Sequence, residues 1–180
     1  MTQIVEIERE DLTEAPPRRI VLADGREVLL RPLLPDDDAL YAEFDSHLTA
    51  EDRRLRFLVA LRAIPQTQVF RLTHFDRRDA RAYAAIEPGT GRLLGVGRIH
   101  RLLGGEGEFA VLVRSDLQGL GLGHVLMNAV LEGARALGLR SVLGLILREN
   151  VNMIAICREL GFSFSAASEP SLVEARLRLS

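Results

Sequence analysis

The spacing of apolar positions changes at residue 121, and this change is the clearest structural signal in the sequence. Before it, segments at 81–87, 92–101 and 107–113 are rich in apolar residues and are separated by Pro-Gly and Gly-Gly pairs. This pattern is typical of strands joined by tight turns. After it, apolar residues recur every three or four positions until Gly138, which predicts an amphipathic helix. We therefore expect an antiparallel meander followed by a long helix.

The flanking segments predict the remaining elements. Asp24-Gly25 stands between two apolar runs within residues 18–33, which is a strong signal for a β-hairpin. Acids at 36–38 precede apolar residues at four-residue spacing, which predicts a helix over 36–48. Further elements are expected in chain order: helical pieces at 50–64 and 66–75, a buried strand at 141–147, a helix at 152–160 ended by Gly161, and closing strands at 162–167 and 172–179.

Length and composition limit the classes of protein that fit. A chain of 180 residues usually forms one domain, and we expect a flexible N-terminal arm over the acidic residues 1–17 before a domain at 18–180. The net charge of −2 gives no cationic surplus for nucleic acid. No apolar run is long enough to span a membrane, and no signal peptide is evident, so we expect a cytoplasmic protein. A single cysteine excludes an internal disulfide and a multi-cysteine metal site, and no metal is expected.

The segment "VRSDLQGLGLGH" places glycines at 119, 121 and 123 between the last meander strand and the long helix. The first N–H groups of a helix lack partners and attract anions. Glycines there would permit positive φ and remove side chains that keep a phosphate or pyrophosphate away. A dinucleotide-binding motif would need glycine where His124 stands, and the Gly-Lys-Ser/Thr of a P-loop is absent. On the glycines alone, a plain tight turn is an equal alternative.

A wider pattern supports the anion-binding interpretation. Gln118-x-x-Gly121-x-Gly123 follows an apolar strand, and beyond the long helix come a second strand, Asn150 and a helix that ends at Gly161-Phe162. This arrangement resembles the acetyl-CoA-binding core of the GNAT superfamily of N-acetyltransferases. The upstream segments "LRPLLPDDDALYAEFDSHLTAEDRRLRF" and "RLTHFDRRDARAYAAI" are similar to the catalytic domain of bacterial Pat-type protein lysine acetyltransferases. The similarity covers about residues 27 to 167.

The resemblance implies both a fold and a binding mode. The fold would be a single α/β domain of the α+β type, with a mixed, mostly antiparallel sheet flanked by helices and a V-shaped opening between the fourth and fifth core strands. The strand "FAVLV" would lie along the pantetheine arm of acetyl-CoA, and backbone N–H groups of the glycine turn would hold the pyrophosphate. The residues expected to contact acetyl-CoA are Val111, Leu112, Val113, Gln118, Gly119, Leu120, Gly121, Leu122, Gly123, His124 and Asn150.

Acetyl transfer to an amine needs a proton acceptor. A lysine ammonium has a reference pKa of about 10.4, so few molecules offer a free lone pair at neutral pH. Glu108 begins the strand "EFAVLV" and matches the glutamate that acts as general base in Pat-like enzymes. The alternative is a solvated carboxylate at a hairpin end. His100 is a weaker candidate for the base, and a backbone N–H in a splayed strand at 111–113 could stabilise the oxyanion.

Other polar residues carry weaker expectations. Many GNAT members have a tyrosine as general acid four residues before the final Gly-Phe pair; here that position is Cys157, which we interpret as a small packing residue. Arg114 and Arg148 flank the expected cofactor site, with solvated arginines as the default. The charged run "DRRLRF" is interpreted as an exposed helix face. The remaining histidines are His47 and His74, expected beside the acceptor region, and His124, expected to add positive charge near phosphate.

The functional hypothesis is transfer of an acetyl group from acetyl-CoA to a primary amine by direct attack. A lysine on a protein, such as an acyl-CoA synthetase, leads the acceptors through resemblance alone. A small amine is the alternative acceptor, because the variable helices at 36–75 cannot be interpreted from sequence. A CoA-binding sensor without turnover is a second alternative, motivated by the missing tyrosine.

Overall fold

The computed structural model describes residues 15–180, and the arm predicted at 1–17 lies almost entirely outside them. The described chain forms one sheet in the order β1-β2-β3-β4-β5-β6-β8-β7. Every neighbouring pair is antiparallel except β5 and β6, which are parallel. The strands are β1 (Arg18–Val21), β2 (Glu27–Pro32), β3 (Ala80–Ile86), β4 (Leu93–Arg101), β5 (Glu106–Val113), β6 (Ser141–Leu147), β7 (Ser163–Ala166) and β8 (Leu172–Arg178). The predicted mixed, mostly antiparallel sheet is confirmed.

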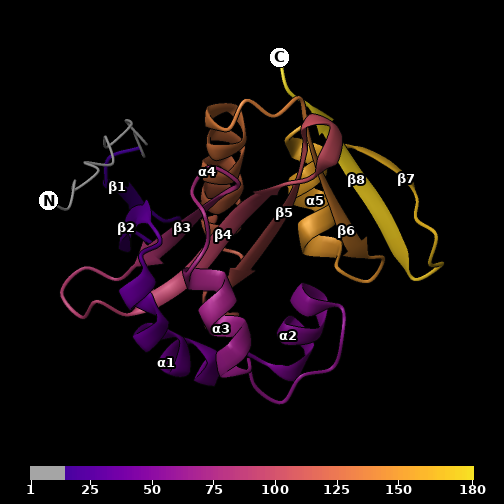
Figure 1. Ribbon diagram of the computed structural model, residues 1–180. Helices are drawn as coiled ribbons and strands as arrows, with labels where there is room; N and C mark the ends of the chain where they lie inside the picture. Colours follow the sequence, from indigo (N-terminus) through magenta and orange to yellow (C-terminus); the bar gives the residue numbers. More distant parts are fainter. Residues whose placement is uncertain (1–14) are drawn as a thin grey trace, which may run out of the picture.

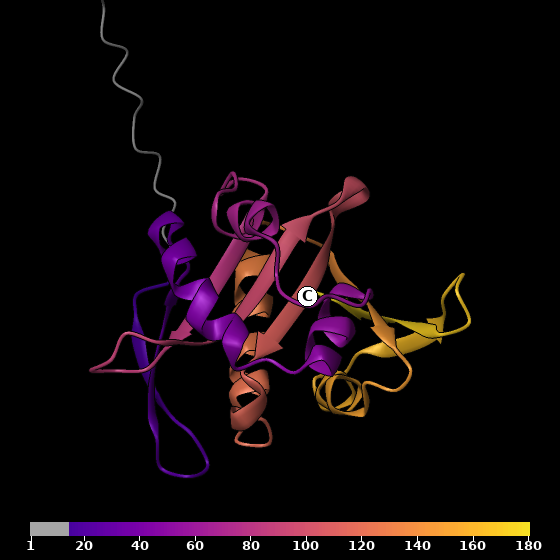
Figure 2. The same cartoon turned by 90° about the horizontal axis from the view of Figure 1, so that it is seen from below.

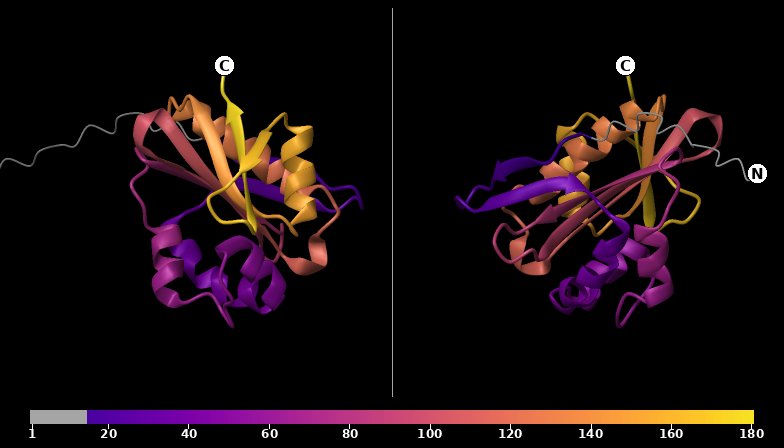
Figure 3. Two further views of the ribbon diagram at one scale, coloured as in Figure 1. Left: turned by 90° about the vertical axis from the view of Figure 1, so that its right-hand side faces the viewer. Right: turned by 60° about the vertical axis from the view of Figure 1, so that its left-hand side comes forward.

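Helices cover both faces of this sheet (Figure 1). They are α1 (Tyr41–Ser46), α2 (Ala50–Phe57), α3 (Gln66–Thr73), α4 (Leu122–Ala136) and α5 (Val151–Glu159), together with the short 3₁₀ helices η1 (Pro35–Leu40), η2 (Leu103–Gly105) and η3 (Ser115–Leu117). Seen from below, the segment from α1 to α3 lies nearest the viewer (Figure 2). The side views show the same three helices gathered at one side of the molecule, away from α4 and α5 (Figure 3).

Strand β3 explains how the two layers of helices are held. All seven of its residues are buried, and alternate side chains of a strand point to opposite faces. Ala82 and Ala84 pack into the core beneath α1 and α3, whereas Tyr83 and Ala85 pack against α4. A central strand covered on both faces needs a continuous apolar run, and the sequence supplies one. The sheet therefore separates the α1–α3 layer from α4.

The parallel pair β5 and β6 separates after a short contact. Their register runs only from Glu106 opposite Ser141 to Glu108 opposite Leu143. Strand β5 nevertheless stays paired with β4 as far as Val113. Beyond Glu108 the edge of β5 that faces β6 therefore has no strand partner. The expected V-shaped opening is therefore present, but it lies between the fifth and sixth strands of the chain rather than the fourth and fifth, because β4 and β5 stay paired. The two strands β5 and β6 diverge toward the side of α2 in Figure 1.

Two of the predicted helices are longer than the helices found in the structure. The helix predicted over 36–48 is instead η1 followed by the short α1. The Asp37 carboxylate accepts the Leu34 N–H at 2.7 Å and pairs with Arg31 of β2, which holds the first turn in a tight form. The helical piece predicted over 50–64 ends at Phe57, because Leu58 adopts a left-handed backbone with φ of 62°. The segment after Leu58 is therefore irregular and leaves space beside the sheet.

Candidate functional site

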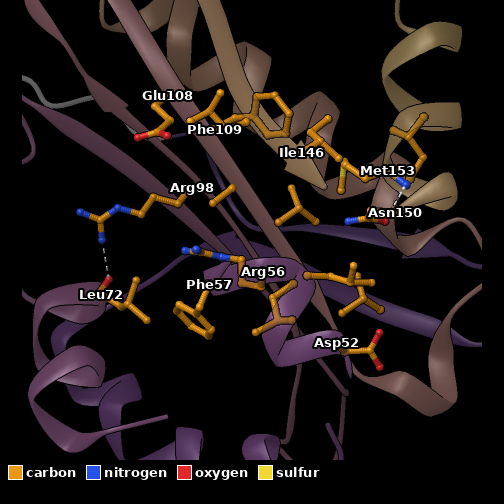
Figure 4. Close-up of a pocket in the computed structure, with 18 of the residues that line it drawn as sticks. Asp52, Arg56, Phe57, Leu72, Arg98, Glu108, Phe109, Ile146, Asn150 and Met153 are labelled. Carbon is orange, nitrogen blue, oxygen red and sulfur yellow. Dashed lines mark hydrogen bonds between the residues drawn. The ribbon is translucent and has the colours of Figure 1, made fainter. Parts of the chain in front are cut away.

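A cleft of about 980 Å³ enters the molecule where β5 and β6 diverge. One wall consists of β5, β6 and the first turns of α5, and the other consists of α2, α3 and the turn between β5 and α4. Glu108 lies at one end, and Asn150 lies toward the other (Figure 4). The volume is within the range of sites that bind a small molecule or cofactor. The cleft thus joins the open edge of β5 to the glycine turn.

The glycine turn has the shape predicted for two of its three glycines. Gly119 and Gly121 have φ of 79° and 93°, a region that residues with a side chain seldom adopt. The expectation of positive φ at Gly123 is wrong, because Gly123 belongs to the first turn of α4. A Cβ there would lie 2.9 Å from Cδ1 of Ile156, the flexible end of that side chain. Gly121 therefore sets the start of the helix, and Gly123 lets α5 pack close to it.

The amide groups of this turn have no carbonyl partners in the described chain. The first N–H of α4 with a partner is that of Val125, which donates to the Gly121 carbonyl at 3.1 Å. The N–H groups of residues 118–124 donate to no backbone or side-chain acceptor of residues 15–180. The turn lies at the positive end of the α4 dipole. Together these groups form a site suited to a large anion such as a pyrophosphate.

Asp52 of α2 fixes the turn from the neighbouring helix on the same wall of the cleft. Its carboxylate accepts hydrogen bonds from the Gln118 side chain at 2.9 Å, from the Thr49 hydroxyl at 2.7 Å and from the Ser115 hydroxyl. Burial alone would raise the pKa of Asp52, but these hydrogen bonds outweigh it and lower the pKa. The Gln118 side chain is therefore committed to Asp52, and only its backbone N–H faces a ligand.

The other residues predicted to contact acetyl-CoA lie in different places. The cleft is lined by Val111, Leu112, Val113, Gln118, Gly119, Gly121, Gly123, His124 and Asn150. Leu120 and Leu122 do not line it: Leu122 is buried in the core under α4, and the Leu120 carbonyl accepts the Ala23 N–H at 3.2 Å. The His124 ring lies 2.7 Å from Glu159. The Asn150 side chain caps α5 by accepting the Met153 N–H at 3.2 Å, and its amide nitrogen faces the cleft (Figure 4).

Glu108 and His100 form a pair at the end of the cleft. They are opposite each other in the β4–β5 ladder, and His100 Nε2 lies 3.4 Å from Glu108 Oε2. Burial lowers the pKa of His100 below 6.5, and Arg98 and Arg56 lower it further, although Glu108 raises it in part. The imidazole is therefore neutral at pH 7 and gives Glu108 no cationic partner. Because 36% of the Glu108 side chain remains exposed, its carboxylate can be reached from the cleft.

Two arginines of the cleft were not predicted from the sequence. Arg56 of α2 and Arg98 of β4 both line it, and the charged run that contains Arg56 had been interpreted as an exposed face. Arg53 in the same run is only 8% exposed and donates to Asp45 at 2.7 Å. Arg53 and Arg56 are three residues apart and so share one side of the helix. The three-residue spacing of Arg53 and Arg56, with the apolar Phe57 beside them, was the feature of the sequence that could have indicated an inward-facing side of this helix.

The comparisons with known proteins identify the family. A family model described as an acetyltransferase (GNAT) domain matches residues 27–163. The chain belongs to the GNAT acetyltransferase family. GNAT proteins use acetyl-CoA as co-substrate, and this agrees with a cleft that joins an open strand edge to an anion-binding turn.

Individual relatives support this membership in the GNAT family. A Pseudomonas aeruginosa protein described as an acetyltransferase is 33% identical over 144 residues, covering 78% of this chain and 77% of that protein. The GNAT domain of S. lividans PAT has a TM-score of 0.85 and 26% identity, covering 92% of this chain and 100% of that domain. The structure of yncA from Salmonella typhimurium, solved with its cofactor acetyl-CoA, has a TM-score of 0.64 at 19% identity over 85% of this chain and 94% of that one, which shows the fold alone.

Several polar residues considered from the sequence lie away from the cleft of this GNAT acetyltransferase. Arg114 is not a solvated arginine, because it is buried and paired with Asp116 at 2.9 Å. Arg148 donates to the Pro170 carbonyl at 2.7 Å. His47 contacts Glu43 at 3.2 Å, and His74 stacks on Phe70 with ring centroids 4.0 Å apart. None of these four lines the cleft.

Cys157 occupies the position where many GNAT acetyltransferases have a tyrosine. It is 0% exposed, packs in the core between α4 and α5, and does not line the cleft. Burial raises the pKa of its thiol to about 12. This agrees with its interpretation as a small packing residue. Within residues 15–180 no helix combines the length and the apolar character needed to cross a membrane.

Proposed function

We propose that this GNAT acetyltransferase transfers the acetyl group of acetyl-CoA to a lysine side chain of a protein, with Glu108 as general base. The observation that carries the proposal is the position of Glu108. It stands at the last residue pair between β5 and β6, where the opening begins, and its partly exposed carboxylate lines the cleft. A base at this point is within reach of an amine that enters beside the open edge of β5.

The cleft suits the two ends of acetyl-CoA in different ways. The free N–H groups of residues 118–124 at the start of α4 would hold the pyrophosphate. The edge of β5 from 109 to 113 lacks a strand partner on the β6 side, so the amides of pantetheine could pair with it as an added strand does. The free amide nitrogen of Asn150 faces the same space (Figure 4). Val111 and Val113 would supply apolar contacts.

The proposed reaction needs one proton acceptor and no covalent enzyme intermediate. The Glu108 carboxylate takes a proton from the lysine ammonium, directly or through one water molecule, and frees the lone pair of the amine. This lone pair attacks the thioester carbonyl carbon, a C–N bond forms, and the C–S bond breaks as CoA leaves. The remaining surplus proton on the nitrogen passes to water. The thiolate of CoA takes its proton from water, since Cys157 is buried away from the cleft.

A protein acceptor is supported by similarity rather than by the site. The chain resembles Pat-type protein lysine acetyltransferases in its upstream helices, and its fold is close to that of the GNAT domain of S. lividans PAT. An acyl-CoA synthetase is the acceptor that we propose to test first. A cytoplasmic location fits that partner.

Replacing Glu108 tests the base. Glu108→Gln should lower kcat by roughly 10²- to 10⁴-fold, the usual contribution of a positioned general base, while leaving the affinity for acetyl-CoA unchanged in calorimetry. Glu169→Gln is the control, because Glu169 is exposed in the loop before β8 and does not line the cleft. Equal turnover by the two variants would remove Glu108 from the mechanism. Binding of acetyl-CoA with no turnover, even by the unmodified protein, would favour a CoA-binding sensor.

The acceptor is tested with separate panels of purified proteins and small amines. Incubation with acetyl-CoA should release CoA fastest with an acyl-CoA synthetase, and mass spectrometry should find the acetyl group on a lysine of that protein. Acetylation of small amines alone would replace the protein acceptor by a small molecule and leave the transferase reaction in place.

A further inference from the structure

A small recess opens from the cleft on the face of the sheet that carries Glu108. Its volume is about 10 Å³, roughly the space of one water-sized sphere. The lining residues are Tyr41, Phe44, Arg56, Phe57, Leu72, Val96, Arg98, Ala110 and Leu112, and several of these also line the main cleft. The space admits a single oxygen atom at its bottom, and it is too small for a phosphate group.

Tyr41 brings an unsatisfied hydroxyl to this recess. Its side chain is 2% exposed, and its Oη is buried without a hydrogen-bond partner among the described residues. A buried hydroxyl without a partner costs free energy, so this group needs a partner from outside the fold, either a water molecule or an oxygen atom of a ligand. Burial raises the pKa of Tyr41 well above 10, and the hydroxyl therefore stays protonated and can donate. The recess thus offers a neutral hydrogen-bond donor.

Arg56 and Arg98 add two cations to the same recess. Arg56 stacks on Phe57 at 4.7 Å but forms no ion pair with a described carboxylate. Arg98 stacks on Phe75 at 4.8 Å and donates through one nitrogen to the carbonyls of Arg71 and Leu72 at 3.3 and 3.2 Å. No other hydrogen bond joins its guanidinium to residues 15–180, and Figure 4 shows the contact with Leu72. Burial lowers the pKa of Arg56 to about 10, so it is still charged at pH 7. Neither arginine forms an ion pair with a carboxylate of residues 15–180, although the charge of Glu108 acts on Arg56 and raises its pKa in part. Two partly buried cations side by side favour an anion in this recess.

The ladder between β4 and β5 relates this site to the proposed base. Arg98 is opposite Ala110, and His100 is opposite Glu108. Opposite residues of a ladder and residues two apart on one strand share a face of the sheet. The recess and Glu108 therefore lie side by side on the face that α2 covers. Ala110 lines the recess and is two residues from Glu108 along β5, which corresponds to about 7 Å at the usual rise per residue. One acceptor molecule can reach both.

We propose that the acceptor carries a carboxylate at the far end of the chain from its amine, and that Tyr41, Arg56 and Arg98 bind this carboxylate while the amine meets Glu108. The proposal rests on the acetyl transfer proposed above and adds the chemistry of the acceptor. A carboxylate fits the planar, bidentate geometry of a guanidinium, and one of its oxygens fills the recess. The spacing suits an ε-amine with the carboxylate of free lysine, or with that of an acidic residue beside a lysine in a protein.

Matched acceptors that differ only in the carboxylate test the proposal. Nα-acetyl-lysine should be acetylated with a kcat/KM at least about tenfold higher than that of Nα-acetyl-lysinamide, the effect of one charge-assisted contact. Peptides that place Glu or Gln beside one lysine distinguish a side-chain carboxylate from a terminal one. Arg56→Gln should bring these ratios close to one. Arg62→Gln changes the same charge at an exposed position outside the cleft and should retain them.

A binding measurement separates this proposal from the transfer reaction. Hexanoate, which is lysine without its amines, should bind the protein in the presence of CoA more tightly than hexanamide does, as measured by calorimetry. Arg56→Gln should abolish this preference, and Tyr41→Phe, which removes one oxygen only, should weaken it several-fold. Hexanoate selectivity without any acetyl transfer would leave the carboxylate site and remove the transferase proposal.

The opposite results would overturn the carboxylate site alone. Equal turnover of the carboxylate and amide acceptors, together with equal binding of hexanoate and hexanamide, would contradict it while transfer continued. A preference for the carboxylates that survives in both Arg56→Gln and Tyr41→Phe would place the recognition elsewhere.

Discussion

The side chain at position 157 decides whether the helix α5 could supply a proton to the leaving thiolate. Cys157 is fully buried and lies outside the cleft. We expect Cys157→Tyr to destabilise the fold by at least about 2 kcal/mol, because a much larger side chain must enter a packed core, and not to raise kcat. Urea unfolding and steady-state kinetics measure both effects. Cys157→Ala, which keeps the site small, is the control and should cost about 1 kcal/mol.

If Cys157→Tyr had native stability and a higher kcat, the side chain at position 157 would instead reach the reacting atoms. At this residue the sequence was sufficient, since a lone cysteine in an apolar helix pattern predicts packing. At Arg56 it was not, because a run of charged residues does not reveal which members turn inward. That depends on the sheet that α2 covers, and Arg56 enters the cleft only because β5 and β6 diverge beneath it.

The turn into α4 depends on two glycines for different reasons, and these reasons can be separated. Gly121→Ala places a side chain at φ of 93° and should cost about 1 to 2 kcal/mol, with weaker binding of acetyl-CoA. Gly123→Ala lies in the helix, where alanine is favoured by up to about 1 kcal/mol, and its Cβ meets only the flexible end of Ile156. We therefore expect little change in its stability. Urea unfolding of the two variants gives the comparison.

If Gly123→Ala lost as much stability as Gly121→Ala, the conformational explanation would be wrong. The sequence predicted the type of nearly every element, including the hairpin at Asp24-Gly25 and the long helix α4, because their apolar periods are strong. It did not predict where α2 ends. Leu58 adopts the left-handed conformation without being glycine, and no local pattern announces such a residue. The end of that helix is set by tertiary packing.

The whole molecule should respond to acetyl-CoA along the opening between the strands. Bound acetyl-CoA at 100 times its Kd should add about 2.7 kcal/mol to the free energy of unfolding. Hydrogen exchange followed by mass spectrometry should show slower exchange at 118–124, whose N–H groups lack partners within residues 15–180, and at 109–113, whose edge toward β6 is unpaired. The β1–β2 hairpin lies at the far edge of the sheet and serves as the internal control. Protection confined to other segments would contradict the proposed binding mode.

For the whole molecule, the family resemblance seen in the sequence predicted the architecture and the general position of the cleft. It could not predict the recess at Tyr41, Arg56 and Arg98. Those residues come from three elements that are far apart in the chain, and their meeting depends on how α1 and α2 pack on the sheet. The acceptor region is therefore the part of the molecule for which the structure was needed.

The brief pairing of β5 with β6 has a mechanical consequence. Strands β1 to β5 form one part of the sheet and β6 to β8 form the other. The two parts are joined by three residue pairs between β5 and β6, and Glu108 belongs to the last of these pairs. If the two halves tilt against each other as ligands enter and leave, this joint acts as the pivot. Points near a pivot move least, so Val113 at the wide end would swing while the Glu108 backbone kept its place. A tilt of this kind would widen the opening for a long donor while it kept the alignment of Glu108, the proposed general base.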